Sequence, residues 1–210
     1  MANQKALMVV AGSGAVLFAL LLSRRASAAP KVTPEIVKDL IDAKSIKVGK
    51  YFNLAEFLVS GAFPELASYR PTETELANLR AVCALILDPL REKYGPLEIT
   101  SGGRPESIAA AHGTTWYAKL KEAGDTPAKV SDHTDFSGVD FVVPGITADK
   151  LISLTDDLKN GDNVRQVGLY FKTVKGVKIL DHVHTAVITP KHPKITTSSF
   201  YYVYVDNKIV

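Results

Sequence analysis

Residues 164–188, VRQVGLYFKTVKGVKILDHVHTAVI, carry the pattern that decides the fold. Apolar and β-branched residues fill both halves of this stretch, and Lys175-Gly176 divides them. Runs of this composition are typical of strands, and a glycine-containing pair between two of them predicts a hairpin turn. We therefore expect strands at residues 164–171, 177–180, 182–188 and, further along the chain, 200–205.

The chain before this stretch carries helical patterns. Thr72 and Glu75 predict a capping box, in which a hydroxyl and a carboxylate bind backbone amides of the first helical turn. Apolar residues then recur at helical spacing as far as residue 93, and Gly95-Pro96 ends the helix. Cys83 lies on this apolar stripe, and we expect it to be a small core residue.

Shorter elements complete the pattern. A short helix is expected after Asn53, a longer one at 148–158, and strands at 97–100 and 139–143. Because helices come first and a run of adjacent strands follows, the order predicts an α+β domain, an antiparallel sheet with flanking helices.

Composition excludes several classes of protein. The 210 residues include 25 Lys and Arg, 22 Asp and Glu, and one cysteine, so no disulfide framework or Cys-rich metal site is expected. Three of the basic residues, Lys5, Arg24 and Arg25, lie in the first 28 residues, which contain no acidic residue. The remainder has no basic surplus of the kind that nucleic-acid binders carry, so no nucleic-acid partner is expected.

The first 28 residues predict a signal peptide or a membrane anchor. Residues 6–22 are 17 uncharged, mostly apolar residues, which is the short limit for a membrane-spanning helix. Ala26-Ser27-Ala28 is a small-x-small cleavage site, whereas Arg24 and Arg25 in front of it favour an uncleaved anchor. Both alternatives predict a hydrophobic N-terminal helix that contacts a membrane, and an extracytoplasmic protein that is membrane-anchored or secreted.

The rest of the chain is expected to hold one domain after a linker. Residues 29–50 mix prolines and lysines with one short amphipathic stretch, which is typical of a linker. From residue 51 the pattern is that of a folded unit, so the domain is expected at 51–210.

Two stretches contain the residues of a metal site. In Ser131–Asp140, SDHTDFSGVD, His133 precedes Asp140 by seven residues at the start of a strand, and Asp181–His184, DHVH, opens a later strand. A catalytic zinc needs three His or carboxylate ligands and a nearby carboxylate that accepts a proton from water. His133, Asp140 and His184 supply the ligands, and Asp181 the base.

Other interpretations of the histidines stay open. His182 shares a strand face with His184, so it is an alternative ligand or a neighbour that contacts one. The competing interpretation of the metal residues is a loop histidine, a strand-end carboxylate and a surface histidine that bind no ion. We expect His112 and His192 to face solvent, and Trp116 to pack within its connection.

With these residues the chain resembles the M15 family of zinc D-Ala-D-Ala peptidases, which cut peptidoglycan stem peptides. The metal motifs Ser131-x-His133 with Asp140, and Asp181-x-x-His184, match in order. Residues 52–60, FNLAEFLVS, resemble the opening motif of the branch common in bacteriophages. Residues 87–91, LDPLR, continuing to ITSGGR at 99–104, resemble the helix, strand and SGxR turn before the metal site. The resemblance covers about residues 51–190.

The resemblance implies the Hedgehog-like DD-peptidase fold and a zinc peptidase mechanism. His133, Asp140 and His184 would bind Zn²⁺, and Asp181 would be the general base. Arg104 would bind the scissile carbonyl oxygen or a substrate carboxylate, and Ser131 would contact substrate. The implied function is a zinc-dependent peptidoglycan hydrolase, either a DD-carboxypeptidase or an L-Ala-D-Glu endopeptidase, with stem peptides as partners.

Departures from the family pattern motivate an alternative function. Gly103 stands where the family usually has an aromatic wall residue, and Phe136 stands where it usually has glycine. Asp181 stands where the base is often glutamate. The alternative is a phage virion or envelope structural protein that keeps the fold as a wall-binding or assembly module, with virion subunits as partners and little or no catalysis.

Overall fold

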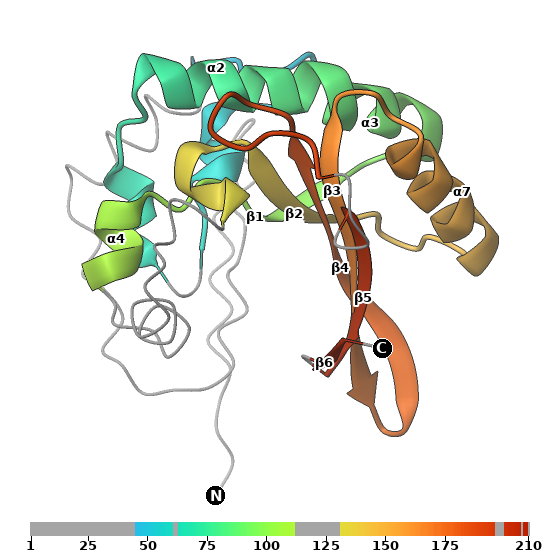
Figure 1. Ribbon diagram of the computed structural model, residues 1–210. Helices are drawn as coiled ribbons and strands as arrows, with labels where there is room; N and C mark the ends of the chain where they lie inside the picture. Colours follow the sequence, from blue (N-terminus) through green and yellow to red (C-terminus); the bar gives the residue numbers. More distant parts are fainter. Residues whose placement is uncertain (1–44, 61–62, 112–130, 196–199, 207, 210) are drawn as a thin grey trace, which may run out of the picture.

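The computed structural model describes residues 45–60, 63–111, 131–195, 200–206 and 208–209 (Figure 1). The predicted N-terminal segment, His112 and Trp116 lie outside these residues. Within the described residues, no helix has both the length and the apolar character needed to cross a membrane. The signal peptide or anchor at 1–28 therefore stays a prediction.

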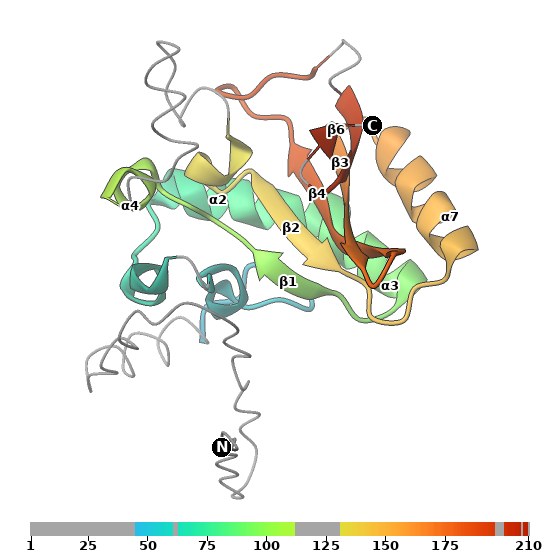
Figure 2. The ribbon, with the colours of Figure 1, turned by 90° about the horizontal axis from the view of Figure 1, so that it is seen from below.

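A six-stranded sheet with the order β1-β2-β4-β3-β5-β6 forms the centre of the domain. Helices pack along it, so the expected α+β class is confirmed (Figures 1 and 2). The strands are β1 (Glu98–Ser101), β2 (Gly138–Val142), β3 (Val164–Val174), β4 (Val177–Val187), β5 (Tyr201–Val205) and β6 (Lys208–Ile209).

The long predicted helix is present as α2 (Glu73–Val82), a π-helical turn η3 (Cys83–Leu87) and α3 (Asp88–Tyr94). Its capping box is confirmed, because Thr72 N donates to Glu75 Oε2 at 2.7 Å and Glu75 N donates to Thr72 Oγ1 at 3.3 Å. Gly95 ends the helix with a φ of 95°, a conformation that favours glycine. Cys83 is fully buried, as expected of a core residue.

The remaining helices are short, apart from the one near 148. Those near 53 and 148 were predicted, whereas α4 was not. They are η1 (Leu54–Phe57), η2 (Pro64–Ser68), α4 (Glu106–Ala111), η4 (Asp132–Asp135) and α7 (Ala148–Lys159). Val48, inside the expected linker, is buried in the domain core.

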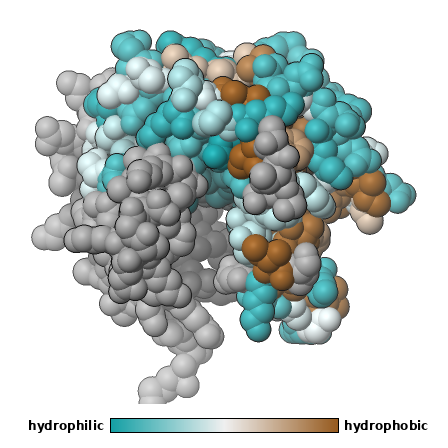
Figure 3. All heavy atoms as spheres, viewed as in Figure 1, coloured by the Kyte–Doolittle hydropathy of each residue, from teal (hydrophilic) through white to brown (hydrophobic). Residues whose placement is uncertain are grey.

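The β3–β4 hairpin is longer and more continuous than the sequence predicts. The two strands expected at 177–180 and 182–188 form one strand, interrupted by a bulge where Tyr170 pairs with His182 and Phe171 with Leu180. The far end of the hairpin extends beyond the helices (Figure 1) and carries brown, apolar atoms in Figure 3. Val174, Val177 and Ile179 are exposed there.

The sheet is mixed, so the expectation of a purely antiparallel sheet is wrong. β5 pairs in parallel with β3, through Val167 with Tyr201 and onward to Phe171 with Val205. The reason is topological. Because β4 already has β2 and β3 as neighbours, β5 joins the free edge of β3, and the chain leaves β4 beside the start of β3. A strand that enters from that end runs parallel to β3.

Strand alternation separates the core from the candidate site. Val139, Phe141, Val183 and Val167 are fully buried in the cluster that also contains the long helix and α7. Successive side chains of a strand point to opposite faces. Asp140 and His184, which are direct partners across β2 and β4, therefore project from the face away from this core.

The two unusual residues Gly103 and Phe136 compensate for one another. Phe136 is fully buried and has a φ of 62°, the left-handed conformation that follows η4. Its ring occupies the space where a side chain at Gly103 would begin, and Tyr69 stacks on it at 5.9 Å. The aromatic volume expected at position 103 is thus supplied from position 136.

We predict that Gly103→Ala lowers the free energy of unfolding by about 1–3 kcal/mol, because the new Cβ overlaps the Phe136 ring. In a Phe136→Leu background the same substitution should cost less, since the smaller side chain leaves room. Denaturant unfolding of the four proteins in this double-mutant cycle measures the coupling. Costs that add to within about 0.5 kcal/mol would contradict the compensation.

Candidate metal centre

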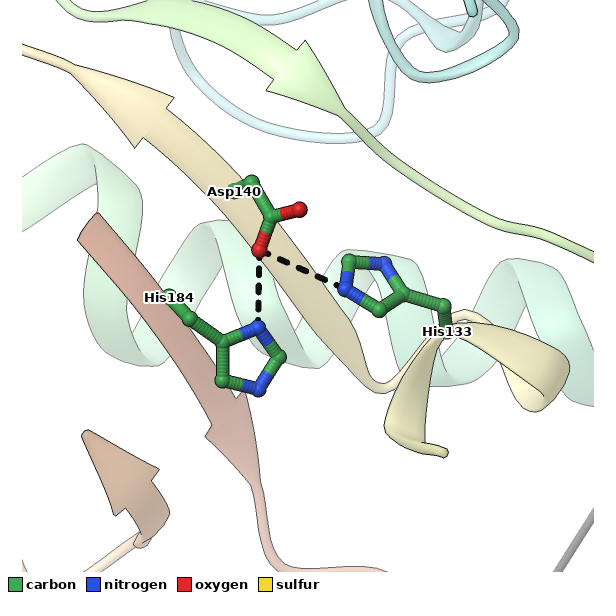
Figure 4. A group of neighbouring side chains, drawn as sticks. All are labelled: His133, Asp140 and His184. Atoms are coloured by element: carbon green, nitrogen blue, oxygen red, sulfur yellow. Dashed lines mark hydrogen bonds and ion pairs between the residues drawn. The ribbon is translucent and has the colours of Figure 1, made fainter. Parts of the chain in front are cut away.

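Three side chains from separate elements converge on the face away from the core (Figure 4). Asp140 Oδ1 lies 2.8 Å from His184 Nδ1 and 3.3 Å from His133 Nε2. One potential ligand atom from each residue lies within 4.8 Å of the other two. The structure thus brings together all three predicted metal ligands, and His133 and His184 are almost completely buried.

Local structure explains this convergence. Asp140 and His184 are placed by strand pairing alone, as opposite residues of β2 and β4. His133 comes from the short helix η4, which ends at Asp135, and two residues separate it from β2, which begins at Gly138. Gly138 keeps the junction narrow, because a Cβ there would lie 2.6 Å from Asp132 Cβ and 3.3 Å from His184 Cε1.

Hydrogen bonds fix the orientation of the His133 ring. His133 Nδ1 lies 2.7 Å from the carbonyl oxygen of Gly102, which can only accept, so Nδ1 carries the proton. Nε2, the nitrogen that a neutral ring leaves free for an ion, faces Asp140. Metal-binding histidines generally use this arrangement, in which one ring nitrogen donates to the protein and the other is free for the ion.

The charges of this group depend on one another. Burial alone would raise the pKa of Asp140, but the two histidines hold it well below its usual value. Burial alone would lower the pKa of His184, but the carboxylates of Asp132 and Asp140 raise it to about 9. Without a metal, the positive charge of protonated His184 therefore balances the buried carboxylate.

A second buried carboxylate lies behind His184. Asp132 Oδ2 lies 3.8 Å from His184 Nε2 and accepts a 2.7 Å hydrogen bond from Arg165 Nη1. Burial would raise the pKa of Asp132, but His184, Arg165 and His192 together lower it, so it stays ionised. An anion on this side favours a proton on Nε2, which leaves Nδ1 as the ligand atom beside Asp140.

His192 belongs to this network, so the expectation that it faces solvent is wrong. Its side chain is 1% exposed, with Nδ1 3.5 Å from Asp132 Oδ1 and Nε2 3.6 Å from Asp135 Oδ2. It follows β4 in the chain, where the backbone folds back through a Thr189–His192 hydrogen bond. That turn, invisible in the residue pattern, carries the ring inward.

Asp181, the predicted base, lies on the same side of the sheet as the ligands because of the β4 bulge. In a regular strand, residues three apart point to opposite faces, whereas a bulge adds one residue and re-aims a side chain. Asp181 is the extra residue, and it contacts His182 and Lys172, whose partners in the strands place them on that side. Burial raises the pKa of Asp181, but these two neighbours lower it overall, so it is a carboxylate.

His182 contacts the predicted base rather than the ligand group. Its Nδ1 lies 3.0 Å from Asp181 Oδ2, and its ring stacks on Tyr170 at 4.2 Å. Among the described residues, the group that suits a metal ion consists of His133, Asp140 and His184 without it. The structure therefore leaves His182 out of the ligand group and places it against the predicted base, Asp181.

Arg104 and Ser131 lie beside His133. The backbone amide of Arg104 donates to the His133 carbonyl oxygen at 2.7 Å, and its Nη2 donates to Ser101 Oγ at 3.1 Å. Burial lowers the pKa of Arg104, opposed by Asp140, and within the described residues its Nε has no hydrogen-bond partner. Ser131 is half-buried at the start of η4, where its carbonyl oxygen accepts from Thr134.

The sequence interpretation missed Asp132, Arg165 and His192. Asp132 could have been found, because it lies next to His133 in the motif. Arg165 and His192 are 33 and 60 residues further along the chain than Asp132, and no spacing in the sequence indicates that they contact it.

Searches of protein-family models, curated proteins and solved structures find no match to this chain. The candidate metal centre is therefore argued from the geometry of this chain alone.

We predict that the metal-free protein loses stability as the pH rises from about 6.5 to about 9. His184 has a higher pKa when folded than when unfolded, so its contribution is complete below about pH 6.5 and disappears as pH passes the folded value. The expected slope is at most about 1.4 kcal/mol per pH unit. Chemical unfolding in the presence of a chelator measures it, and His184→Gln should flatten the profile; equal slopes in both proteins would contradict the assignment.

We also predict that Asp132→Asn weakens the binding of cobalt(II) by about 10–100-fold, because the neutral amide orients His184 less strongly. Asp135→Asn is the matched control, since Asp135 lies in the same network and contacts Ser137 and His192 instead. Titration followed by visible absorption measures both affinities. Equal affinities in the two folded variants would show that Asp132 does not orient the ligand.

Proposed function

We propose that the chain is a zinc-dependent peptidoglycan hydrolase that cuts a stem-peptide bond, as a DD-carboxypeptidase or an L-Ala-D-Glu endopeptidase of the M15 type. The observation that carries the proposal is the convergence of His133 Nε2, Asp140 Oδ1 and His184 Nδ1. Two imidazoles and one carboxylate match a catalytic zinc site, in which a fourth position stays open.

The donor set fits the ion. The two imidazoles present free nitrogens on the same side of one carboxylate, and their other nitrogens face Gly102 and Asp132. A bound zinc ion would act as a Lewis acid and lower the pKa of a bound water to about 7. We assign the ligand role to His133, Asp140 and His184.

The other side chains then have separate tasks. Asp181 is ionised and on the ligand side of the sheet, so it can accept a proton and pass it on. Among the described residues the Nε of Arg104 has no hydrogen-bond partner. This group, with the charge of the guanidinium, suits a carbonyl oxygen or carboxylate of the peptide. Ser131, at the start of η4, is assigned to substrate contact.

We further propose an extracytoplasmic location, with attachment to a membrane through residues 6–22 or secretion after cleavage. The support is the uncharged apolar run and its basic flanks. A peptidoglycan substrate lies in the same compartment, so location and activity agree.

A second candidate is a virion or envelope structural protein that binds cell wall without cutting it. One observation favours it. Both carboxylate oxygens of Asp181 have a cationic or imidazole neighbour, with Lys172 Nζ at 2.6 Å from one and His182 Nδ1 at 3.0 Å from the other. A base held in this way has to exchange a partner before it can accept a proton.

We predict that the purified full-length chain with zinc releases a terminal D-Ala or a new stem-peptide fragment from peptidoglycan, as detected by mass spectrometry. Asp181→Ala should keep the metal and slow cleavage by about 10²–10⁴-fold, because it removes only the proton acceptor. Asp140→Ala should lose both metal and activity. Asp157→Ala, on the α7 side of the domain, is the control for a carboxylate outside the site.

Two results would contradict this proposal, the first its activity and the second its mechanism. Stoichiometric zinc without any muropeptide product would favour the wall-binding role. Cleavage that survives Asp140→Ala after metal is lost would refute the metal mechanism itself.

A further inference from the structure

A cluster of aromatic side chains lies next to the candidate metal centre on the same face of the sheet. Strand pairing aligns Asp140, His184, Gly168 and Tyr202 in one row across β2, β4, β3 and β5. The adjacent row holds His182, Tyr170 and Tyr204. The ligands and the tyrosines are therefore parts of one continuous surface.

Gly168 turns Tyr202 toward the metal centre. Because Gly168 has no side chain, the Tyr202 ring lies over it, with Cζ at 2.6 Å and the hydroxyl at 2.8 Å from the position that a Cβ would take. Neighbouring strands lie about 4.8 Å apart, and His184 is the next residue in the row. The hydroxyl thus reaches over the strand that separates Tyr202 from a metal ligand.

A second hydroxyl accompanies the first. Tyr170 Oη lies 3.5 Å from Tyr202 Oη. Burial, together with the nearby carboxylate of Asp140, raises the pKa of both phenols. Both groups consequently keep their protons at neutral pH. Tyr170 donates its proton to Tyr202, so the Tyr202 hydroxyl is the donor that is available to a ligand.

Ring packing decides what this surface can bind. Tyr170 is stacked on both sides, by His182 at 4.2 Å and by Tyr204 at 4.8 Å, and Tyr202 meets Tyr170 and Tyr204 edge to face. The faces of Tyr170 are therefore not free to stack on a sugar ring. What the pair offers a ligand is its hydroxyl edge, with Lys172 and His182 as the nearby basic groups.

We propose that the Tyr170–Tyr202 pair is a substrate subsite of the metal centre, which binds a carboxylate or carbonyl oxygen of the peptide on the β3–β5 side. The inference rests on the proposed function and names a binding determinant for it. The candidate ligand residues lie between this pair and Arg104, so the substrate would be held by donors on both sides of the reacting bond. Stem peptides, which are rich in carboxylates, match such donors.

The test uses substitutions that remove only the hydroxyls. Tyr170→Phe and Tyr202→Phe keep the rings, and Tyr201→Phe is the matched control, because its ring lies on the opposite face beside Lys159. In full-length, zinc-loaded protein carrying Asp181→Ala to prevent turnover, calorimetry measures binding of a stem pentapeptide. We expect each hydroxyl deletion to weaken binding about tenfold or more, with zinc content and the control unchanged.

A second probe separates this inference from the proposed function. Acetate is titrated into the cobalt-loaded variants, with the visible spectrum as readout. If acetate binding depends on the two hydroxyls but the pentapeptide does not bind, the subsite is upheld and the peptidoglycan substrate is refuted. If neither probe distinguishes Tyr170→Phe and Tyr202→Phe from Tyr201→Phe, the subsite is refuted whatever the enzyme does.

Discussion

The buried carboxylate of Asp140, held between two imidazoles, is the interaction on which the functional surface depends. A carboxylate in this position is costly unless cations or donors surround it, and His133 and His184 meet that requirement at 3.3 and 2.8 Å. Asp132 is a second buried carboxylate surrounded by basic side chains, here those of His184, Arg165 and His192. Alternating acids and bases thus extend from the sheet surface into the loop that follows β4.

A bound cation would account for this arrangement of buried charges, because it would compensate the carboxylates directly. Burying two carboxylates beside three imidazoles stabilises a fold less than packed apolar side chains would. The same groups, oriented by Gly102 and Asp132, are what a divalent metal needs. The bulge at Asp181, the buried Arg104 and the tyrosine pair then surround this point from three sides.

The sequence was sufficient for features that depend on neighbouring residues. The capping box at Thr72, the hairpin turn at Lys175-Gly176 and the alternation that puts Asp140 on one face are all local, and the structure contains them. The three ligands were predicted because their spacing matches a family motif. Local patterns thus identified the class of fold and the candidate site.

Features that depend on contacts between distant segments could not be predicted from the sequence. The parallel pairing of β5 follows from which sheet edge was free, and the burial of His192 follows from a turn that brings it to Asp132. The compensation between Gly103 and Phe136 involves two residues that are 33 apart in the chain. Each residue by itself was interpreted as a departure from the family pattern. Only their packing shows that one replaces the other.

The most direct test of the central claim is to locate zinc in crystals of the protein by anomalous diffraction at the zinc edge. We expect one strong peak within bonding distance of His133 Nε2, Asp140 Oδ1 and His184 Nδ1. A peak at Asp181 and His182 instead, or no peak at any zinc concentration that the crystals tolerate, would contradict it.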